Sequence, residues 1–379
     1  IASMSWILVA NSWMQYPVGM EFNPHEMRNM MDDFWALVLS PVATNKFFHS
    51  VLSGWTLAGV FVIGVSAWLL LKKRNAAMAV RSIKVAGWVG LIGILGTLAT
   101  GDGSAKVVSE VQPMKLAAME GLYKGSCGQS IVAAGILNPD KKIGDNQAPY
   151  LFDISIPCGL SILAEGDPDA FVPGVEDLLA GISLTPEGDT IHGISYAERI
   201  ERGKAAHDAL RRFDIAKAAG DESAMLLAHA DLKKDFDYFG YGYFDEAGEA
   251  VPNIHMTFYA FHIMVILGGY FLLFYIVILF LAYKQRNFLE GNKWWQLVAI
   301  ISIPLVWICS EAGWVVAEVG RQPWVIEGLM PARAAISGIP TSSVITTFTL
   351  FAIIFTGLLI AEINIMLKYI SRKSKENIE

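Results

Sequence analysis

Long apolar segments separated by short polar stretches dominate the hydrophobic pattern of the chain. Each complete segment has about 20 or more mostly apolar residues, enough to cross the hydrocarbon core of a bilayer as a helix. The first segment is the end of such a run. The pattern therefore predicts an all-α, polytopic transmembrane helical bundle with six spans, at residues 1–14, 46–71, 78–100, 254–283, 295–320 and 346–369.

Composition agrees with a membrane protein, because 54% of the 379 residues are hydrophobic and 17% are charged, with a mean hydropathy of +0.42. Soluble domains seldom have so few charges. The chain opens at Ile1 inside an apolar run, with no charged n-region or cleavage site before it, so this run is not a signal peptide. We expect the natural protein to extend further at its N-terminus. No basic, aromatic-interleaved patch suggests a nucleic-acid partner.

Basic residues predict the orientation of the spans. They cluster at Lys72–Arg74, at Lys284–Lys293 and near the C-terminus at Arg372, Lys373 and Lys375. All three clusters fall on one side if the spans alternate, and the positive-inside rule places that side in the cytoplasm. Residues 16–45, the acidic stretch 101–253 and the turn 321–324 are then outside. The predicted domains are 1–100, with spans one to three and the segment 16–45; 101–253, the outer loop; and 254–379, with spans four to six and a cytoplasmic tail.

The outer loop, Gly101–Asn253, is too long for a simple connection and should carry structure or function. Val111–Tyr123 is predicted to be helical, and Ser195–Asp237 to form one or two surface helices. Asp235–Glu249 is predicted to be irregular. Before the loop, the spacing of apolar residues from His25 to Leu39 predicts a short interfacial helix.

The three cysteines, Cys127, Cys158 and Cys309, do not have the spacing of a metal site. Cys309 lies in an apolar run and is interpreted as a small core residue. Cys127 and Cys158 both lie in the outer loop. They would be able to pair if the loop is exported, and they would otherwise remain free thiols.

Ionisable residues inside the predicted spans are the candidate chemistry. Glu311, Trp314, Glu318 and Arg321 are spaced so that they share one stripe of a helix. An ionisable residue in a membrane segment is costly and is read as functional by default. The alternative is a structural ion pair between Glu318 and Arg321 at the helix end.

Two histidines and a methionine lie at the same outer depth as this stripe. They are His49 in span two, and His262 and Met264 in span four. Histidine and methionine together are the ligand pair of a low-spin haem, so the cluster suggests a metal or haem site. The alternatives are a histidine satisfied by helix–helix hydrogen bonds and a methionine that only fills the core. Glu362, in span six, has no partner that the sequence identifies.

Four motifs, in order, then resemble a known family. They are Asn11–Gly19, Lys46–His49, Lys115–Glu120 and Glu311–Trp324, the last with its Gly-Arg-Gln-Pro-Trp. In this order they resemble subunit I of cytochrome bd quinol oxidase over nearly the whole chain. The resemblance begins at the family's fourth span, so we expect three preceding spans to be absent from this chain.

The resemblance implies particular ligands and a quinol site. His49 and Met264 match the axial ligands of haem b558. Lys115 and Glu120 match residues tied to quinol oxidation, where Glu120 would accept a hydroxyl proton and Lys115 would hold the quinol oxygen or the carboxylate. The outer loop would be the periplasmic quinol-binding loop.

The resemblance also implies roles for three residues of the stripe. Glu318 matches the carboxylate ligand at the high-spin pair, haem b595 and haem d, Trp314 the tryptophan between haems, and Arg321 an arginine nearby. His262 departs from the family, which commonly has arginine there, and it is a rival ligand to Met264 for the iron.

The function that the resemblance implies is a haem-containing terminal oxidase subunit in the bacterial cytoplasmic (inner) membrane. It would oxidise quinol outside, reduce dioxygen to water and contribute to the proton motive force. Expected partners are cytochrome bd subunit II, a small single-span subunit, quinol, dioxygen and membrane lipid, and the chain alone is expected to be inactive. The alternative is a haem-free transporter or sensor with a ligand-binding outer loop.

Overall fold

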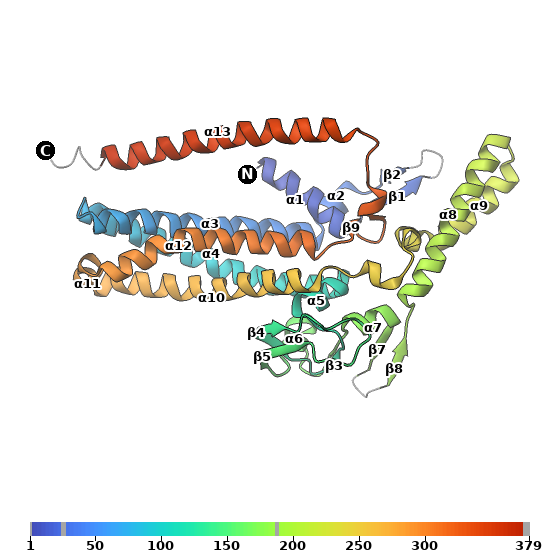
Figure 1. Ribbon diagram of the computed structural model, residues 1–379, viewed down its shortest axis with the longest axis horizontal. Coiled ribbons are helices and arrows are strands. Elements are labelled where there is room, and N and C mark those ends of the chain that lie inside the picture. The colour runs from blue at the N-terminus through green and yellow to red at the C-terminus, as the bar shows by residue number, and fades with distance from the viewer. Residues whose placement is uncertain (1, 24–27, 186–188, 374–379) are drawn as a thin grey trace. The chain divides into compact units, whose positions relative to one another are not determined.

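Most of the chain is helical in the computed structural model, which describes residues 2–23, 28–185 and 189–373 (Figure 1). The longest helices are α3 (Pro41–Leu71), α4 (Ala76–Val111), α10 (Ile254–Lys284), α12 (Lys293–Val319) and α13 (Thr341–Lys373). Among the described residues, five helical segments are long and apolar enough to cross a membrane, and they coincide with predicted spans two to six. The remaining prediction, the end of a membrane helix at residues 1–14, corresponds to α1 (Ala2–Gln15).

Shorter helices connect or follow the long ones. They are α2 (Phe34–Val38), α5 (Pro113–Glu120), α6 (Gly159–Glu165), α7 (Val175–Ala180), α8 (Tyr196–Ala219), α9 (Glu222–Asp235), α11 (Arg286–Gly291) and the 3-10 helices η1 (Phe236–Tyr243), η2 (Ala247–Ala250) and η3 (Ala332–Ala334).

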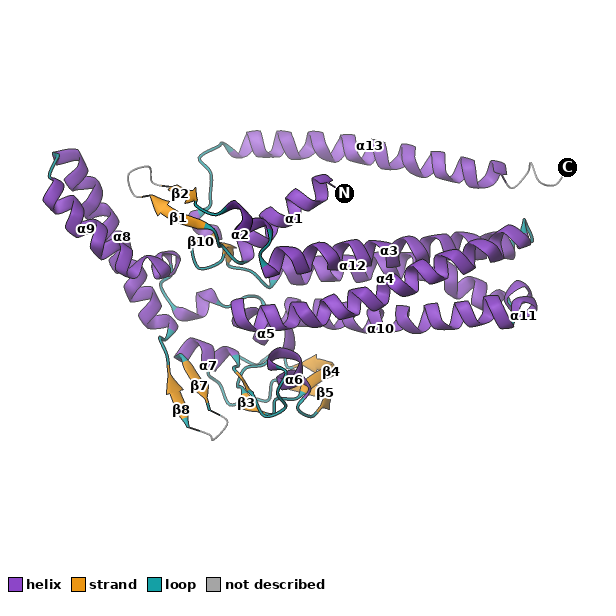
Figure 2. Ribbon diagram, turned by 180° about the vertical axis from the view of Figure 1, so that it is seen from behind, coloured by secondary structure: helices purple, strands orange, loops and turns teal. Residues whose placement is uncertain are grey.

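In the residues that the structure describes, five antiparallel strand pairs accompany the helices, and the all-α prediction did not include them (Figure 2). The pairs are β1 (Met20–Asn23) with β2 (Arg28–Met31), β3 (Ser126–Cys127) with β6 (Phe171–Val172), β4 (Ile131–Leu137) with β5 (Tyr150–Ile156), β7 (Ile182–Leu184) with β8 (Thr190–His192), and β9 (Trp324–Ile326) with β10 (Met330–Pro331).

Residues 20–38 differ from the prediction of one interfacial helix over His25–Leu39. The β1–β2 pair occupies the first part of this range, and Asp33 starts α2 by accepting hydrogen bonds from the N–H groups of Trp35 and Ala36, both at 2.9 Å. An aspartate at the N-cap favours a helix that begins after it rather than through it. His25 and Met27 lie outside the described residues.

The outer loop largely follows its predictions. The predicted helix at Val111–Tyr123 is α5, with proline at its first turn and Gly121 as a left-handed C-cap. The predicted surface helices are α8 and α9. Residues 235–249, predicted to be irregular, lie mostly in the 3-10 helices η1 and η2. The predicted boundary at residue 101 lies inside α4, which continues to Val111.

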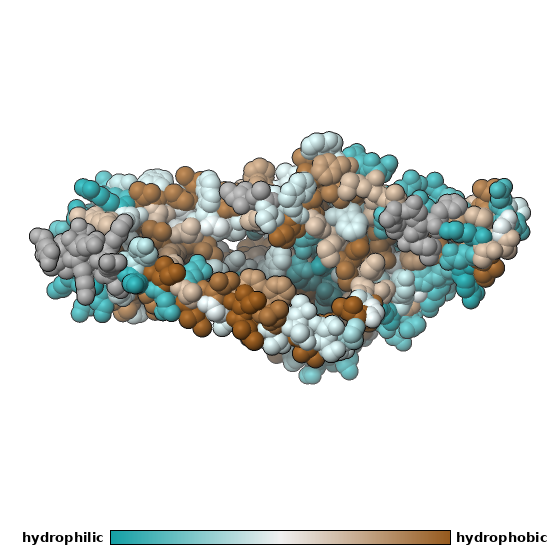
Figure 3. Space-filling model, turned by 90° about the horizontal axis from the view of Figure 1, so that it is seen from above, coloured by the Kyte–Doolittle hydropathy of each residue, from teal (hydrophilic) through white to brown (hydrophobic). Residues whose placement is uncertain are grey.

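The chain divides into two compact units, and the candidate residues lie in the first of them. That unit comprises Ile1–Leu57, Leu91–Phe274 and Pro304–Ala335, and the second comprises Ala58–Gly90, Tyr275–Ile303 and Ile336–Glu379. In the second unit, glycines let helices approach closely, since a Cβ at Gly90 would lie 2.1 Å from the Tyr275 ring. Apolar side chains of the long helices are exposed, as a lipid environment requires (Figure 3).

One hydrophobic core of the first unit includes α5. It joins α5 residues Met114, Ala117 and Ala118 to Phe258 of α10 and Trp324 of β9. All α5 residues from Met114 to Glu120 are buried, including its two ionisable side chains. A short helix with a buried lysine and a buried glutamate marks the place where function is to be sought.

Close backbone approach holds η1 against the turn after β9. The N–H of Gly240 donates to the carbonyl of Gly328 at 3.1 Å, and a Cβ at residue 240 would lie 2.3 Å from that oxygen. We expect Gly240→Ala to lower the Tm of the purified protein, since such overpacking costs about 1–3 kcal/mol. Gly248→Ala is the control, because a Cβ there meets nothing within 4 Å. Equal Tm values for the two variants would contradict this account.

Candidate functional site

Lys115 points from α5 toward α1 and α12. Its Nζ donates to Gln15 Oε1 at 3.2 Å and to the carbonyl of Ala317 at 3.4 Å. Gly320 makes room for the lysine stem, since a Cβ there would lie 3.1 Å from Lys115 Cγ. Burial lowers the pKa of Lys115 to about 8, while the charges of Glu327 and Glu318 act in the opposite direction. Lys115 is therefore a buried amine held by neutral oxygens.

Glu120 points elsewhere, toward β4. Its side chain is 2% exposed, and neither carboxyl oxygen has a hydrogen-bond partner of normal geometry. Burial raises the pKa of Glu120 to about 8, against a smaller effect from the Val132 N–H. The hydroxyl of Tyr150 donates to the Glu120 carbonyl at 2.6 Å and so fixes the backbone at the end of α5.

The structure does not bring Lys115 and Glu120 together. Five residues along a helix correspond to a rotation of about 140°, so the two side chains leave α5 on different faces. Among the described residues, none of the hydrogen bonds or ion pairs of Lys115 goes to Glu120. The two side chains are therefore not paired in this structure, and the role of Lys115 toward the quinol oxygen or the carboxylate stays a prediction.

Glu318 is held at the end of α12 by two partners. Arg321 Nη2 forms an ion pair with its Oε2, and Asn11 Nδ2 of α1 donates to its Oε1 at 2.8 Å. Arg321 Nη1 also donates to the carbonyl of Val325 at 3.0 Å. The ion pair considered for the sequence is thus present. The Glu318 carboxylate can still accept further contacts, because a carboxylate has about four lone-pair directions and this one uses two.

Polar residues of α1 and α3 join this group, and the sequence analysis gave them no role. Lys46 Nζ donates to Asn11 Oδ1 at 2.6 Å, and Gln15 Nε2 donates to the same oxygen at 3.2 Å. Asn11 and Gln15 are four residues apart on an otherwise apolar helix, and Lys46 opens a predicted span. The four-residue spacing of Asn11 and Gln15, and the place of Lys46 at the start of a span, were the signals from which this polar group could have been predicted.

The predicted stripe divides between buried and exposed positions. Arg321 is buried and Glu318 half-buried, whereas Glu311 and Trp314 are exposed. Trp314 has 49% of its surface accessible. The role of Trp314 between haems stays a prediction, and Glu311 has no role that its contacts identify.

The contacts of His49, on α3, favour one tautomer. The hydroxyl of Thr100 donates to the carbonyl of Gly96 at 2.8 Å, so it accepts from His49 Nδ1, which lies 3.0 Å away. The proton is then on Nδ1, and Nε2 keeps its lone pair. A histidine ligand of a metal is normally fixed in this way by a hydrogen bond at its other nitrogen. His49 therefore fits an axial ligand.

Met264, on α10, lies against a glycine of α12. A Cβ at Gly313 would lie 2.9 Å from Met264 Sδ, so a larger residue would displace the thioether. Cys309 Sγ donates to the Met264 carbonyl at 3.5 Å, and Cys309 is half-buried rather than deep in the core. These contacts place the sulfur without engaging it in a hydrogen bond.

His262 is bound at both ring nitrogens. Nδ1 lies 2.9 Å from the carbonyl of Phe258 and Nε2 lies 2.8 Å from the carbonyl of Val132. A nitrogen directed at a carbonyl does not offer its lone pair to iron. These contacts engage both nitrogens in this structure, while the role of His262 as a rival ligand stays a prediction. They make it a link between α10 and β4 of the outer loop.

A cofactor would fit the donor set found here. His49 Nε2 and Met264 Sδ suit a low-spin haem, and a Glu318 oxygen suits a high-spin iron. Two buried polar atoms, Arg321 Nε of the residue paired with Glu318 and Ser12 Oγ of the residue after Asn11, have no hydrogen-bond partner in the structure. Orphaned donors in such a place call for a further group to receive them.

Glu327, in the turn between β9 and β10, is a residue that the sequence analysis missed. Its N–H donates to the Met14 carbonyl at 2.9 Å, and its Oε2 accepts from Gln112 Nε2 at 2.9 Å. Burial raises its pKa to about 7, against the Gln112 hydrogen bond and the charges of Lys115 and Arg321. No local motif marks it, because its partners come from distant parts of the chain.

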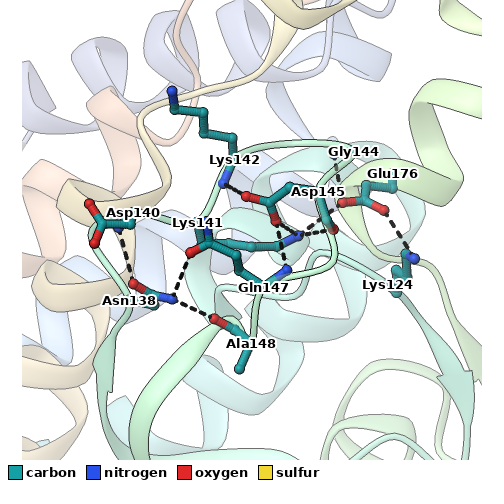
Figure 4. Close-up of polar contacts among 10 residues, drawn as sticks. All are labelled: Lys124, Asn138, Asp140, Lys141, Lys142, Gly144, Asp145, Gln147, Ala148 and Glu176. Atoms are coloured by element: carbon teal, nitrogen blue, oxygen red, sulfur yellow. Dashed lines mark hydrogen bonds and ion pairs between the residues drawn. The ribbon is translucent and has the colours of Figure 1, made fainter.

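A separate polar cluster holds the connection between β4 and β5 (Figure 4). Buried Lys141 forms ion pairs with Asp145 at 2.6 Å and Glu176 at 3.4 Å, and Lys124 approaches Glu176 at 3.7 Å. A cavity of about 440 Å³ lies beside it, and its lining includes neither Lys115 nor Glu120. The cluster shapes the loop and does not contain the predicted quinol residues.

Both loop cysteines are free thiols in this structure. Cys127 is exposed and lies 3.8 Å from the Thr185 carbonyl, and Cys158 is half-buried. The pairing considered for the sequence is not formed. Groups of three or more histidine, cysteine, aspartate or glutamate side chains that would hold a metal ion are absent from the part of the chain that the structure describes.

Comparison with known proteins gives one family. The family model for cytochrome bd terminal oxidase subunit I matches residues 1–374. Cytochrome bd-II ubiquinol oxidase subunit 1 of Escherichia coli (strain K12) is 33% identical over 368 residues, which are 97% of this chain and 70% of that relative. Cytochrome bd ubiquinol oxidase subunit 1 of Bacillus subtilis (strain 168) is 29% identical over 359 residues, 95% of this chain and 61% of that relative.

A solved structure shows the same fold. The bd oxidase of Geobacillus thermodenitrificans matches with a TM-score of 0.66 at 21% identity, covering 98% of this chain and 67% of that chain. The predicted absence of three preceding spans stays a prediction. The family match extends over both the α5 segment and the Glu318 group, and it decides against a haem-free transporter or sensor. The chain belongs to the cytochrome bd terminal oxidase subunit I family.

Proposed function

We propose that this chain is the quinol-oxidising, dioxygen-reducing subunit of a bacterial membrane oxidase. The observation that carries the proposal is the family match over residues 1–374, joined with a His49 side chain whose free nitrogen suits an axial iron ligand. The family carries haem b and haem d groups. Haem, when bound, supplies the electron acceptor and the centre that reduces dioxygen.

Different parts of this chain would hold the haems and bind quinol. His49 and Met264 would hold haem b558, and Glu318 would be the carboxylate at the high-spin pair of haems b595 and d. Arg321 keeps Glu318 oriented through the ion pair, and Trp314 would lie between haems. Residues 101–253 would form the quinol domain, entered at α5.

Quinol would dock at α5, where Lys115 offers a buried amine. A hydroxyl oxygen would replace one of its long contacts, of which the longer is 3.4 Å to the Ala317 carbonyl. Glu120, on the other face, would accept a proton only when ionised, which its raised pKa of about 8 allows on the alkaline side of neutrality. Protons released here would go outside if the basic clusters mark the cytoplasmic side.

Partners follow from the same proposal. Subunit I of an oxidase would assemble with cytochrome bd subunit II and with a small single-span subunit in the inner membrane. In α13, residues 341–369 are all exposed, so this helix is available to lipid or to such a subunit. Membranes containing the intact complex should consume oxygen when quinol is added. Absence of quinol-driven oxygen uptake there would overturn the proposal.

Glu120→Gln is expected to lower quinol-driven turnover about 10²-fold while leaving every haem band in place. Glutamine resembles the protonated acid that burial favours, so folding should be kept. Activity of the unchanged enzyme should rise with pH through about 8, as Glu120 ionises, and this rise should vanish in the variant. The control is Glu165→Gln, which changes an exposed carboxylate in the same loop. Unaltered turnover and an unaltered pH profile in Glu120→Gln would exclude Glu120 as the proton acceptor.

A further inference from the structure

The turn that carries Glu327 is fixed on two sides. The Glu327 N–H donates to the Met14 carbonyl of α1, and the next residue, Gly328, has a left-handed φ of +70° and meets Gly240 of η1. Both neighbours belong to the same compact unit as α5. The position of this carboxylate is therefore built by the fold and does not depend on a mobile loop.

Glu327 is the carboxylate that acts most strongly on Lys115. Of the charged groups that raise the pKa of Lys115, Glu327 has the larger effect and Glu318 the smaller. The ion pairs of the described residues nevertheless include none between Lys115 and Glu327, so the two groups attract each other without direct contact. Gln112, at the start of α5, bridges to Glu327 Oε2 at 2.9 Å. Gln112 thus ties the carboxylate of the β9–β10 turn to the start of α5, three residues before Lys115.

From this arrangement we propose that Glu327 is the carboxylate that works with Lys115 in quinol oxidation. Lys115 holds a hydroxyl oxygen of the quinol, and Glu327 receives the proton of that hydroxyl. The inference rests on the proposed quinol oxidase function. It gives to Glu327 the role toward Lys115 that the resemblance implied for Glu120.

The step balances. The O–H bond of the quinol breaks, its proton binds a carboxylate oxygen of Glu327, and the electrons go to the electron acceptor of the oxidase. Glu327 is half-buried, so it can then pass the proton to water. A quinol that becomes a quinone releases two protons and two electrons. One proton at Glu327 leaves the other for a second acceptor, and Glu120 remains a candidate for that role.

The surroundings of Glu327 suit a base that works near neutral pH. Lys115 and Arg321 favour its ionised form, as does the hydrogen bond from Gln112, while burial opposes it. Tyr196 of α8 and Tyr241 of η1 also face it, and burial raises the pKa of both hydroxyls, so they are neutral at physiological pH. The resulting pKa of about 7 lets the carboxylate both take up and release a proton.

The test uses the intact oxidase in membranes, with Glu327→Gln as the main variant. Quinol-driven oxygen uptake should fall about 10²-fold, and the rise in activity with pH through about 7 should disappear. The haem bands should not change. Oxygen uptake driven by tetramethyl-p-phenylenediamine should also be kept, because this donor supplies electrons without a hydroxyl proton.

Two further variants separate catalysis from structure. Glu327→Asp keeps the carboxylate and should restore part of the quinol activity together with its pH dependence. Glu110→Gln, an exposed carboxylate at the end of α4, is the control and should behave like the unchanged enzyme. The double variant with Lys115→Gln should be little worse than Lys115→Gln alone, because residues that act as one unit are not additive.

Each outcome decides the matter. Unchanged quinol turnover and an unchanged pH profile in Glu327→Gln would overturn the inference while leaving the oxidase function intact. An equal loss with both electron donors, or loss of haem bands, would also overturn it, because it would show a structural role. If the unchanged enzyme consumes oxygen with the phenylenediamine but not with quinol, the proposed quinol oxidase function fails and the inference with it.

Discussion

Replacing His49 with alanine is expected to remove the low-spin b-type absorption band and to leave the high-spin bands in place. The reason is that Nε2 is the nitrogen left free when Nδ1 donates to Thr100 Oγ1 at 3.0 Å. Alanine supplies no ligand, so the low-spin state of that iron is lost. Reduced-minus-oxidised spectra of membranes carrying the intact complex measure this directly.

The control for this change is His192→Ala, because His192 is exposed in β8 of the outer loop. That variant should keep every band. Survival of the b558 band in His49→Ala would contradict the ligand assignment. Loss of all bands in His49→Ala would mean that the variant fails to assemble. Thr100→Val would then distinguish a ligand role of His49 from a role in assembly. It removes only the hydrogen bond that orients the ring, and it should shift or broaden the same band alone.

Glu318→Ala is expected to have the second large effect, on the high-spin haems and on stability together. Arg321 is buried and pairs with Glu318, so its guanidinium would lose its counter-charge. Removing one partner of a buried pair costs about 3–5 kcal/mol. The hydrogen bond from Asn11 would be lost as well. Thermal unfolding and the haem spectrum of the same preparation measure both effects.

Glu311→Ala is the matched control, because it removes an exposed carboxylate from the same helix two turns earlier. It should change neither the Tm nor the bands by a comparable amount. Glu318→Gln keeps the shape and a carbonyl oxygen for the Asn11 amide, so it should be more stable than Glu318→Ala while still weakening the high-spin bands. Full retention of those bands in Glu318→Ala would show that Arg321 and Glu318 form a structural pair only.

The long helices could be predicted because their signal is local. A run of apolar residues is read directly from the sequence, and α3, α4, α10, α12 and α13 coincide with predicted spans. The surface helices α8 and α9 have caps at Ser195 and Asp221 that also act within a few residues. Elements of this kind need no knowledge of tertiary contacts.

The region before α3 shows where such local reasoning fails. Apolar residues from Met30 to Leu37 have helical spacing, yet Met30 and Met31 belong to β2, which pairs with β1. Strand pairing is a contact between segments, which periodicity within one segment does not report. The short strand pairs of the outer loop were missed for the same reason.

The candidate site was only partly predictable. Individual residues such as His49 and Glu318 could be named because their motifs are local and resemble a family. The grouping of side chains depends on packing, which brings Gln15 of α1 to Lys115 of α5 and Glu327 of the β9–β10 turn to Gln112. Glu327 was missed because its partner Gln112 is 215 positions away in the sequence. The separation of Lys115 from Glu120 could have been predicted from the sequence, because their spacing places them on different faces of a helix.

The claim that this chain is the haem-bearing subunit of a quinol oxidase is tested most directly by one spectrum. Membranes carrying the intact complex are reduced with quinol, and the spectrum of the oxidised sample is subtracted. The account predicts α-bands in both the b and the d regions, and their loss again when dioxygen is admitted. Absence of both bands, or bands that form with a chemical reductant but never with quinol, would contradict it.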